Sequence, residues 1–62
     1  MKLTVASFKK ACNLTPKEIA HWPCQERYDV IRRNADECFK MEQITEKTRD
    51  ALYRYATQQL MK

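Results

Sequence analysis

The chain contains no glycine, and this absence limits the folds that it can adopt more than any other feature of the sequence. Tight β-hairpins usually need glycine, because their favoured turns require positive φ angles. Only two prolines interrupt the 62 residues, and 32% of the residues are charged, which suits the solvent-facing sides of helices. We therefore predict an all-α fold, a small single-domain bundle of about four helices over residues 1–62.

The strongest local signal for a helix begins at Thr15. Its hydroxyl can cap the helix, Pro16 suits the first helical position, and Glu18 falls at the capping-box position. Pro23 restricts the chain at the other end. These residues predict a short helix over residues 15–22.

Three further helices are indicated by capping residues and by apolar spacing. The first begins after Thr4 and ends at Asn13, a residue type that tolerates the left-handed conformation. A longer helix is predicted over residues 23–39, where apolar residues repeat at intervals of three and four. Thr45 can cap a last helix that runs to about Leu60.

The predicted hydrophobic centre draws apolar residues from every helix. It comprises Phe8, Leu14, Ile19, Trp22, Ile31, Leu52, Tyr55 and Leu60. Three ion pairs at i, i+4 spacing are also predicted: Asp29 with Arg33, Asp36 with Lys40, and Asp50 with Arg54. Because a chain of this size buries only a small core, we also expect it to self-associate as a homodimer.

The three cysteines are Cys12, Cys24 and Cys38. The odd count and the absence of a secretory signal predict reduced thiols in a cytoplasmic protein, and we interpret all three as small core residues. His21 and Cys24 are three residues apart, which leaves a metal site as an alternative. Structural zinc sites usually show two ligand pairs at short spacing, so we predict no metal and no other cofactor.

Several functions are disfavoured by the composition. No apolar run approaches the ~18 residues of a membrane-spanning helix, so we predict no membrane association. The single histidine and the lack of a Gly-rich phosphate loop argue against an enzyme. The net charge is +4, and residues 1–22 hold four lysines against one glutamate. This basic end fits a polyanionic partner.

The segment from Phe8 to Trp22 resembles the helix-turn-helix of phage Cro-type repressors and their prophage relatives. In that family an apolar residue opens the first motif helix, and Gly or Asn makes the turn. An apolar residue, a Ser or Thr cap, a Val or Ile and often a Trp then follow. The matching residues are Phe8, Cys12, Asn13, Leu14, Thr15, Ile19 and Trp22. With Pro23, Arg27 and Ile31, which echo the family's following basic helix, the resemblance covers residues 8–35.

The resemblance implies a helix-turn-helix-like motif over residues 5–22 whose second helix reads the major groove of double-stranded DNA. The base contacts would come from Lys17 and His21, with Thr15 and Glu18 at the margin. A second set would bind phosphates and so fix the position of the protein along the duplex. It comprises Lys9, Lys10, Arg27, Arg32 and Arg33. The implied function is a small phage-type transcriptional regulator.

A protein-binding module is the alternative function. On the predicted last helix Tyr53 lies beside Arg49 and Arg54, and Tyr with Arg is typical of interface hot spots. Such a module would be a phage-encoded inhibitor or adaptor that docks a host protein, and the same surface would serve a homodimer. Salt separates the two functions, because DNA binding weakens steeply with ionic strength and helix docking much less.

Overall fold

The computed structural model describes residues 2–61, which form four α-helices and no β-strand. The elements in chain order are α1 (Val5–Ala11), α2 (Pro16–Ile19), α3 (Cys24–Lys40) and α4 (Glu46–Leu60). The predicted all-α bundle of about four helices is therefore confirmed.

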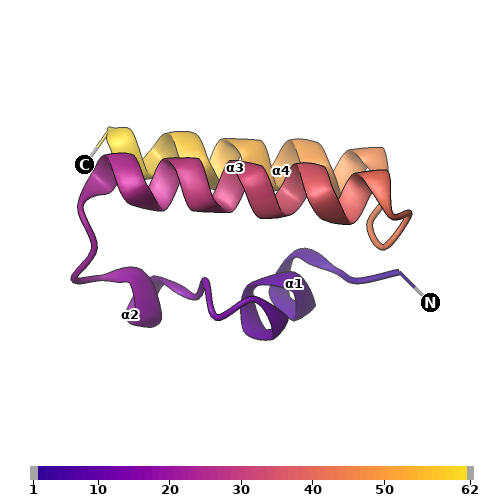
Figure 1. Cartoon of the computed structure of the whole chain (residues 1–62), viewed down its shortest axis with the longest axis horizontal. Helices are drawn as coiled ribbons and strands as arrows, with labels where there is room; N and C mark the ends of the chain where they lie inside the picture. Colours follow the sequence, from indigo (N-terminus) through magenta and orange to yellow (C-terminus); the bar gives the residue numbers. More distant parts are fainter. Residues whose placement is uncertain (1, 62) are drawn as a thin grey trace.

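The helices form two layers (Figure 1). The long helices α3 and α4 pair as an antiparallel hairpin, and α1 and α2 follow each other along one side of it. The loop between the long helices holds the start of the chain: the Leu3 amide donates to the Gln43 carbonyl at 2.9 Å. Lys2 Nζ donates to the carbonyl of Glu42 at 2.8 Å. The N-terminal layer is thus fixed to the closed end of the hairpin.

Two of the predicted helix caps form as expected. The Thr4 hydroxyl accepts a hydrogen bond from the Ser7 amide at 3.1 Å, and the Thr45 hydroxyl accepts one from the Thr48 amide at 3.2 Å. Asn13 has a φ of 57°, so the left-handed conformation predicted after the first helix is also confirmed. These local signals place the starts of α1 and α4 correctly.

The helix predicted over residues 15–22 is shorter in the structure, where α2 contains four residues, Pro16–Ile19. The Thr15 hydroxyl donates to Glu18 Oε1 at 2.7 Å and accepts no backbone amide. The two residues therefore pair, but not as the reciprocal capping box that the sequence predicts. One turn of helix remains, and the amides of Glu18 and Ile19 donate to the backbone carbonyl of Thr15 rather than to its hydroxyl.

The early end of α2 has a partner on α3. Arg27 Nε donates to the Trp22 carbonyl at 2.9 Å, and its Nη2 donates to the Ala20 carbonyl. The guanidinium therefore holds the carbonyls of the loop that leads from α2 into α3. Predicting this contact from the local sequence pattern is not possible, since that pattern contains only the restriction imposed by Pro23.

The hydrophobic core lies between the hairpin and the N-terminal layer. Its buried apolar residues are Phe8, Leu14, Ile19, Ile31, Ala35, Ile44, Leu52, Tyr55 and Ala56. Six of the eight residues predicted for the centre belong to this set. Ile44, in the loop before α4, is a core residue that the sequence reasoning missed.

Two residues of the predicted centre are misplaced. Trp22 is only half-buried beside the core, and Leu60 is 43% exposed at the last position of α4. Gln59 takes the inward position instead: it is 4% exposed, and its side-chain amide donates to the Tyr55 carbonyl at 3.0 Å. Successive helical residues are separated by about 100°, so the inward position of Gln59 turns Leu60 toward solvent.

The three predicted i, i+4 ion pairs do not form among the described residues. Each of the three carboxylates has another partner: Gln25 for Asp29, Tyr53 for Asp36 and Arg49 for Asp50. An exposed ion pair stabilises a helix by only a few tenths of a kcal/mol, so a competing hydrogen bond easily replaces it.

Candidate docking surface on the helical hairpin

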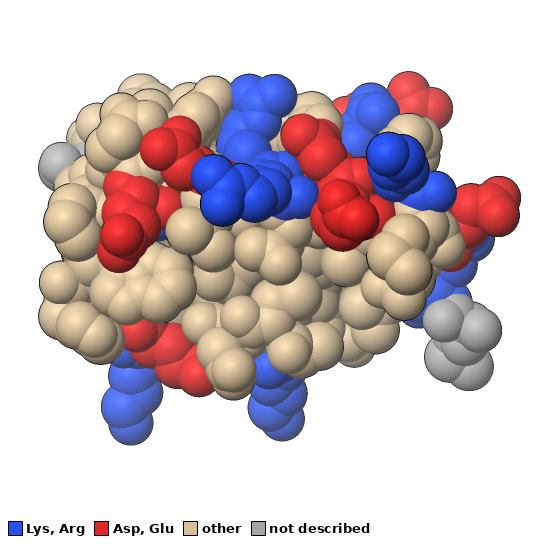
Figure 2. Space-filling view, in the orientation of Figure 1, with Lys and Arg blue, Asp and Glu red and all other residues tan. Residues whose placement is uncertain are grey.

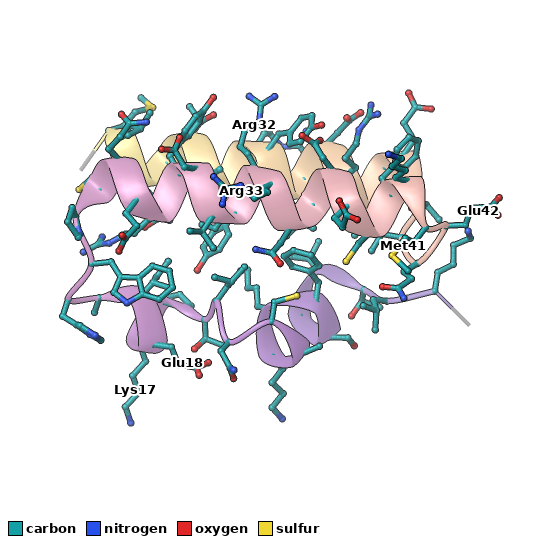
Figure 3. The ribbon with its side chains drawn as sticks, viewed as in Figure 1. Lys17, Glu18, Arg32, Arg33, Met41 and Glu42 are labelled. Atoms are coloured by element: carbon teal, nitrogen blue, oxygen red, sulfur yellow. The ribbon has the colours of Figure 1, made fainter. Side chains whose placement is uncertain are left out.

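The residues predicted to contact DNA bases lie in and around α2. Lys17 and Glu18 are exposed and project away from the hairpin (Figure 3). Thr15 is half-buried and bonded to Glu18, and His21 is exposed in the loop after α2. A helix of four residues is about 6 Å long at 1.5 Å per residue, which is too short to present a row of base contacts. The four residues are near one another, but they do not share a recognition helix.

The residues predicted to hold phosphates are divided among different environments. Lys10 is exposed on α1, whereas the Nζ of Lys9 lies 4.0 Å from the centroid of the Tyr55 ring. The guanidinium of Arg27 is engaged by the loop carbonyls of Ala20 and Trp22. Lys9, Lys10 and Arg27 therefore differ in how freely they can reach a ligand.

The other two arginines of this set belong to α3, and the structure separates them from the base-contact set. Arg32 projects from the edge of the hairpin opposite to Lys17, and Arg33 lies on the side of α3 between the two edges (Figure 3). Figure 2 shows basic side chains at both edges, with a broad uncharged region between them. A DNA duplex lying against α2 would leave Arg32 on the far side of the protein.

Aromatic rings and guanidinium groups alternate along the hairpin on the edge that carries Arg32. The Cζ of Arg32 lies 4.1 Å from the Tyr53 ring centroid and 5.6 Å from that of Tyr28. The Cζ of Arg49 lies 4.5 Å from the Phe39 ring centroid and 5.4 Å from that of Tyr53. The order Tyr28, Arg32, Tyr53, Arg49, Phe39 thus forms a continuous cation–π stack between α3 and α4, which we call the ladder.

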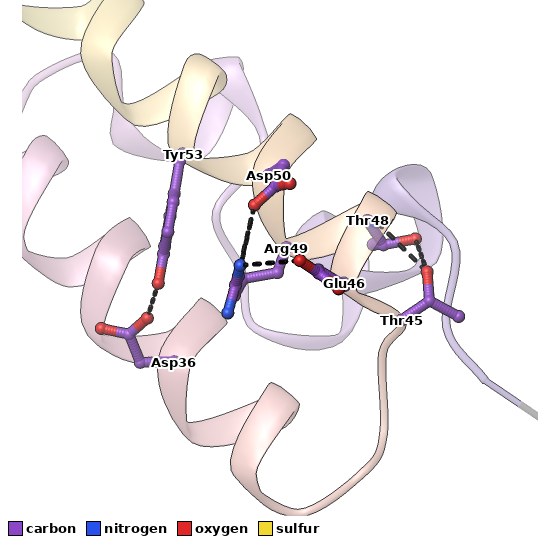
Figure 4. Close-up of polar contacts among 7 residues, drawn as sticks. All are labelled: Asp36, Thr45, Glu46, Thr48, Arg49, Asp50 and Tyr53. Atoms are coloured by element: carbon purple, nitrogen blue, oxygen red, sulfur yellow. Dashed lines mark hydrogen bonds and ion pairs between the residues drawn. The ribbon is translucent and has the colours of Figure 1, made fainter.

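Hydrogen bonds hold the middle of the ladder in place. Arg32 Nη1 donates to the Tyr28 hydroxyl at 2.8 Å, and the Tyr53 hydroxyl donates to Asp36 Oδ1 (Figure 4). The bond to Asp36, followed by burial, raises the pKa of Tyr53 above its usual value. The bond to Tyr28 is the main reason that the pKa of Arg32 is raised. Tyr53 therefore stays neutral and Arg32 stays charged across the physiological pH range.

Arg49 is oriented by two carboxylates of its own helix (Figure 4). Its Nη2 lies 3.1 Å from Asp50 Oδ1 and 3.7 Å from Glu46 Oε1. The hydrogen bond to Asp50 is the first cause of the raised pKa of Arg49. These exposed ion pairs add little to stability, but they restrict the guanidinium to the position between Tyr53 and Phe39.

A groove of about 330 Å³ continues from the ladder toward the end of α4. Its lining residues are Tyr53, Arg54, Thr57, Gln58 and Met61, and its surface is mostly apolar. Met61 is 80% exposed. Of the residues predicted for a protein interface, Arg49 and Tyr53 are therefore joined in the ladder, and Arg54 lies beside it in the groove.

Sequence reasoning missed the contribution of α3 to this surface. Tyr28, Asp36 and Phe39 were not assigned to a site, and Arg32 was assigned to phosphate binding. The spacing of Tyr28 from Arg32, and of Arg49 from Tyr53, is i, i+4, which places each pair on one helical face. That spacing was an available signal for both halves of the ladder.

None of the three cysteines lines the groove or belongs to the ladder. Cys12, Cys24 and Cys38 are free thiols, and each is half-buried. Cys12 and Cys38 pack against the core, as their interpretation as small core residues predicts, whereas Cys24 does not belong to the core cluster. Burial, followed by the neighbouring Cys38 thiol, raises the pKa of Cys12. Within residues 2–61, no group of three or more His, Cys, Asp or Glu side chains is arranged to hold a metal ion.

None of the helices in the described part of the chain has both the length and the apolar character needed to cross a bilayer. No protein-family model, curated protein or solved structure matches the chain.

Proposed function

We propose that this protein is a small helical protein-binding module and that its partner docks on the ladder and the groove, which together are called the docking face. The observation that carries the proposal is the ladder itself. Tyr and Arg are among the residue types most enriched in binding hot spots, and here two tyrosines and two arginines are stacked at one surface.

The fixed geometry of the ladder favours binding. Ordering a flexible side chain at an interface costs roughly 0.5–1.5 kcal/mol. Arg32 and Arg49 are already held by aromatic rings and by hydrogen bonds, so much of this cost is met before a partner arrives. The adjoining groove adds an apolar recess in which a partner side chain can be buried.

DNA binding is the second candidate function, and exposed lysines support it. Lys10 and Lys17 are both exposed, and Lys17 projects from the N-terminal layer (Figure 3). The support is weaker than for protein docking, because α2 is a single turn and Arg32 lies at the opposite edge. A regulator that reads the major groove normally presents a longer helix to it.

Site-specific photo-cross-linking in cells tests the two functions against each other. A photoreactive amino acid replaces residue 54 in the groove or, for comparison, residue 10 on α1. We expect residue 54 to give cross-links to protein and residue 10 to give none. Cross-links to nucleic acid from residue 10, with no protein cross-link from residue 54, would replace the proposal with DNA binding.

The partner identified in this way can be titrated in purified form. We expect Arg32→Ala to weaken its binding about tenfold or more, because a central hot-spot residue contributes at least about 1.4 kcal/mol. Lys17→Ala is the matched control, since it also removes one positive charge but lies at the opposite edge. Equal effects of the two substitutions would contradict docking on the ladder.

A further inference from the structure

We propose that the docking face binds a second copy of this chain, with the two α4 helices antiparallel about a two-fold axis. This inference rests on the proposed function, because it names the occupant of the same face. Its support comes from the distribution of charge and of exposed apolar side chains along the hairpin.

The exposed surface of α4 carries an acidic and a basic side chain one helical turn apart, Asp50 and Arg54. Arg54 belongs to the groove end, and no acidic residue of the described chain lines the groove. Glu46 and Asp50 belong to the other end, where Arg49 is their shared partner. Lys47 and Arg49 balance the two carboxylates, so this end is neutral overall, and the complementarity is the local one between Asp50 and Arg54.

The spacing of these charges suits a symmetric pair. In a two-fold interface, residue i of one copy meets residue j of the other, and the reverse contact occurs as well. Asp50 and Arg54 are one helical turn apart on α4. An axis crossing α4 near residue 52 therefore brings Asp50 of each copy opposite Arg54 of the other, and forms two equivalent ion pairs.

Asp50 and Arg54 can each form a further hydrogen bond or ion pair with a second copy. The Asp50 side chain is 48% exposed, and Arg49 contacts it only at Oδ1, so Oδ2 is free to accept from a second copy. Arg54 is exposed and has no hydrogen bond or ion pair with another described residue. An Arg–carboxylate pair of this kind also fixes the register of the two helices.

Exposed apolar residues lie at both ends of the docking face. Met61 lies at the groove end of the face and is 80% exposed, whereas Phe39 lies beside Arg49 at the other end and is 36% exposed. An antiparallel arrangement carries the Met61 end of one copy toward the Phe39 end of the other. Burying these side chains between two copies would add apolar contact area to a chain whose own core is small.

Sedimentation equilibrium with charge-reversed variants tests this arrangement. Asp50→Arg places two positive charges opposite each other, and Arg54→Asp places two negative charges opposite each other. We expect the wild type to dimerise and each single variant to weaken dimerisation about tenfold or more. An equimolar mixture of the two variants should recover a heterodimer, because the arginine introduced at position 50 of one copy then faces the aspartate introduced at position 54 of the other. Lys17→Asp, a charge reversal at the opposite edge, should leave the dimer unchanged.

Circular dichroism confirms that each variant is folded before it is compared. If a single variant fails to fold, a chain changed only at residue 54 provides the test: two copies with a photoreactive residue 54 should become a covalent dimer joined through their tryptic peptides of residues 50–62. A monomeric wild type, or variants that neither weaken nor restore association, would overturn the antiparallel dimer.

If the wild type is monomeric and residue 54 captures a different protein, the dimer is wrong but the docking function stands. If residue 54 captures no protein at all, the docking function fails as well.

Discussion

The hydroxyl of Tyr55 donates a hydrogen bond to the backbone carbonyl of Leu14 at 2.8 Å, which joins the middle of α4 to the turn between α1 and α2. Both residues are buried. Leu14 follows Asn13, whose left-handed conformation turns the chain at this point. The turn of the helix-turn-helix-like motif that the sequence resemblance implies is therefore fastened into the core of the protein by α4.

Removing this hydrogen bond should destabilise the fold. Tyr55→Phe leaves the buried Leu14 carbonyl without its partner, and we expect the free energy of unfolding to fall by about 1–3 kcal/mol in urea titration. Tyr53→Phe is the matched control, because its hydroxyl contacts Asp36 at the surface. If Tyr55→Phe lowers the free energy of unfolding no more than Tyr53→Phe does, the Leu14 carbonyl must have another hydrogen-bond partner.

Arg27 should contribute more to stability than Arg33 on the same helix. Arg27 donates to the carbonyls of Ala20 and Trp22, whereas Arg33 is exposed. We expect Arg27→Ala to cost about 1–2 kcal/mol and Arg33→Ala to stay within about 0.5 kcal/mol of the wild type. Thermal unfolding followed by circular dichroism measures both. A silent Arg27→Ala would mean that the loop into α3 holds its shape without the guanidinium.

Glu42 occupies a backbone conformation that suits glycine better. Its φ is 60°, and an L-residue with a Cβ pays roughly 1–2 kcal/mol in this region. We therefore expect Glu42→Gly to stabilise the protein by about 0.5–1 kcal/mol, after the added freedom of glycine in the unfolded chain is subtracted. Asn13→Gly should give a smaller gain, because asparagine tolerates this conformation. Chemical denaturation of both variants measures which gains more stability. A loss of stability in Glu42→Gly would contradict the prediction.

Stability should decrease in alkaline solution. Burial raises the pKa of Cys12 above 9.0 and the pKa of Tyr55 above 10.0. Both groups hold their protons more tightly in the folded state, so their contribution is fully present below the unfolded pKa values. It is lost as the pH rises through the folded pKa values. Urea titrations should therefore show a decline that begins near pH 9. Cys12→Ser should remove the earliest part of that decline, whereas a profile that is flat to about pH 11 would contradict it.

Much of the fold could be predicted from local sequence. Thr4, Asn13 and Thr45 mark helix ends through contacts with residues at most a few positions away, so their roles can be read without knowing the tertiary structure. The apolar repeat of the long third helix likewise follows from helical geometry, and Ile31 and Ala35 are buried as that repeat requires.

The length of α2 and the position of the candidate site depended on contacts between separate elements. Arg27 binds the carbonyls of Ala20 and Trp22 in the loop after α2, and this pairing follows only from the way α3 approaches the loop. The ladder similarly needs Arg32 of α3 beside Tyr53 of α4, which requires the register of the hairpin. Each half of the ladder was visible as i, i+4 spacing, but the contact between the halves was not.

The way the two layers are joined also determines the order in which the chain can fold. Pairing α3 with α4 closes only the loop at residues 41–45, which carries a small entropic cost. Docking the N-terminal layer requires contacts such as Tyr55 with Leu14, which are 41 residues apart. Contacts of long sequence separation form more slowly than local ones. We therefore expect the hairpin, with the ladder between its helices, to assemble first and the turn at Asn13 to be fastened to it last.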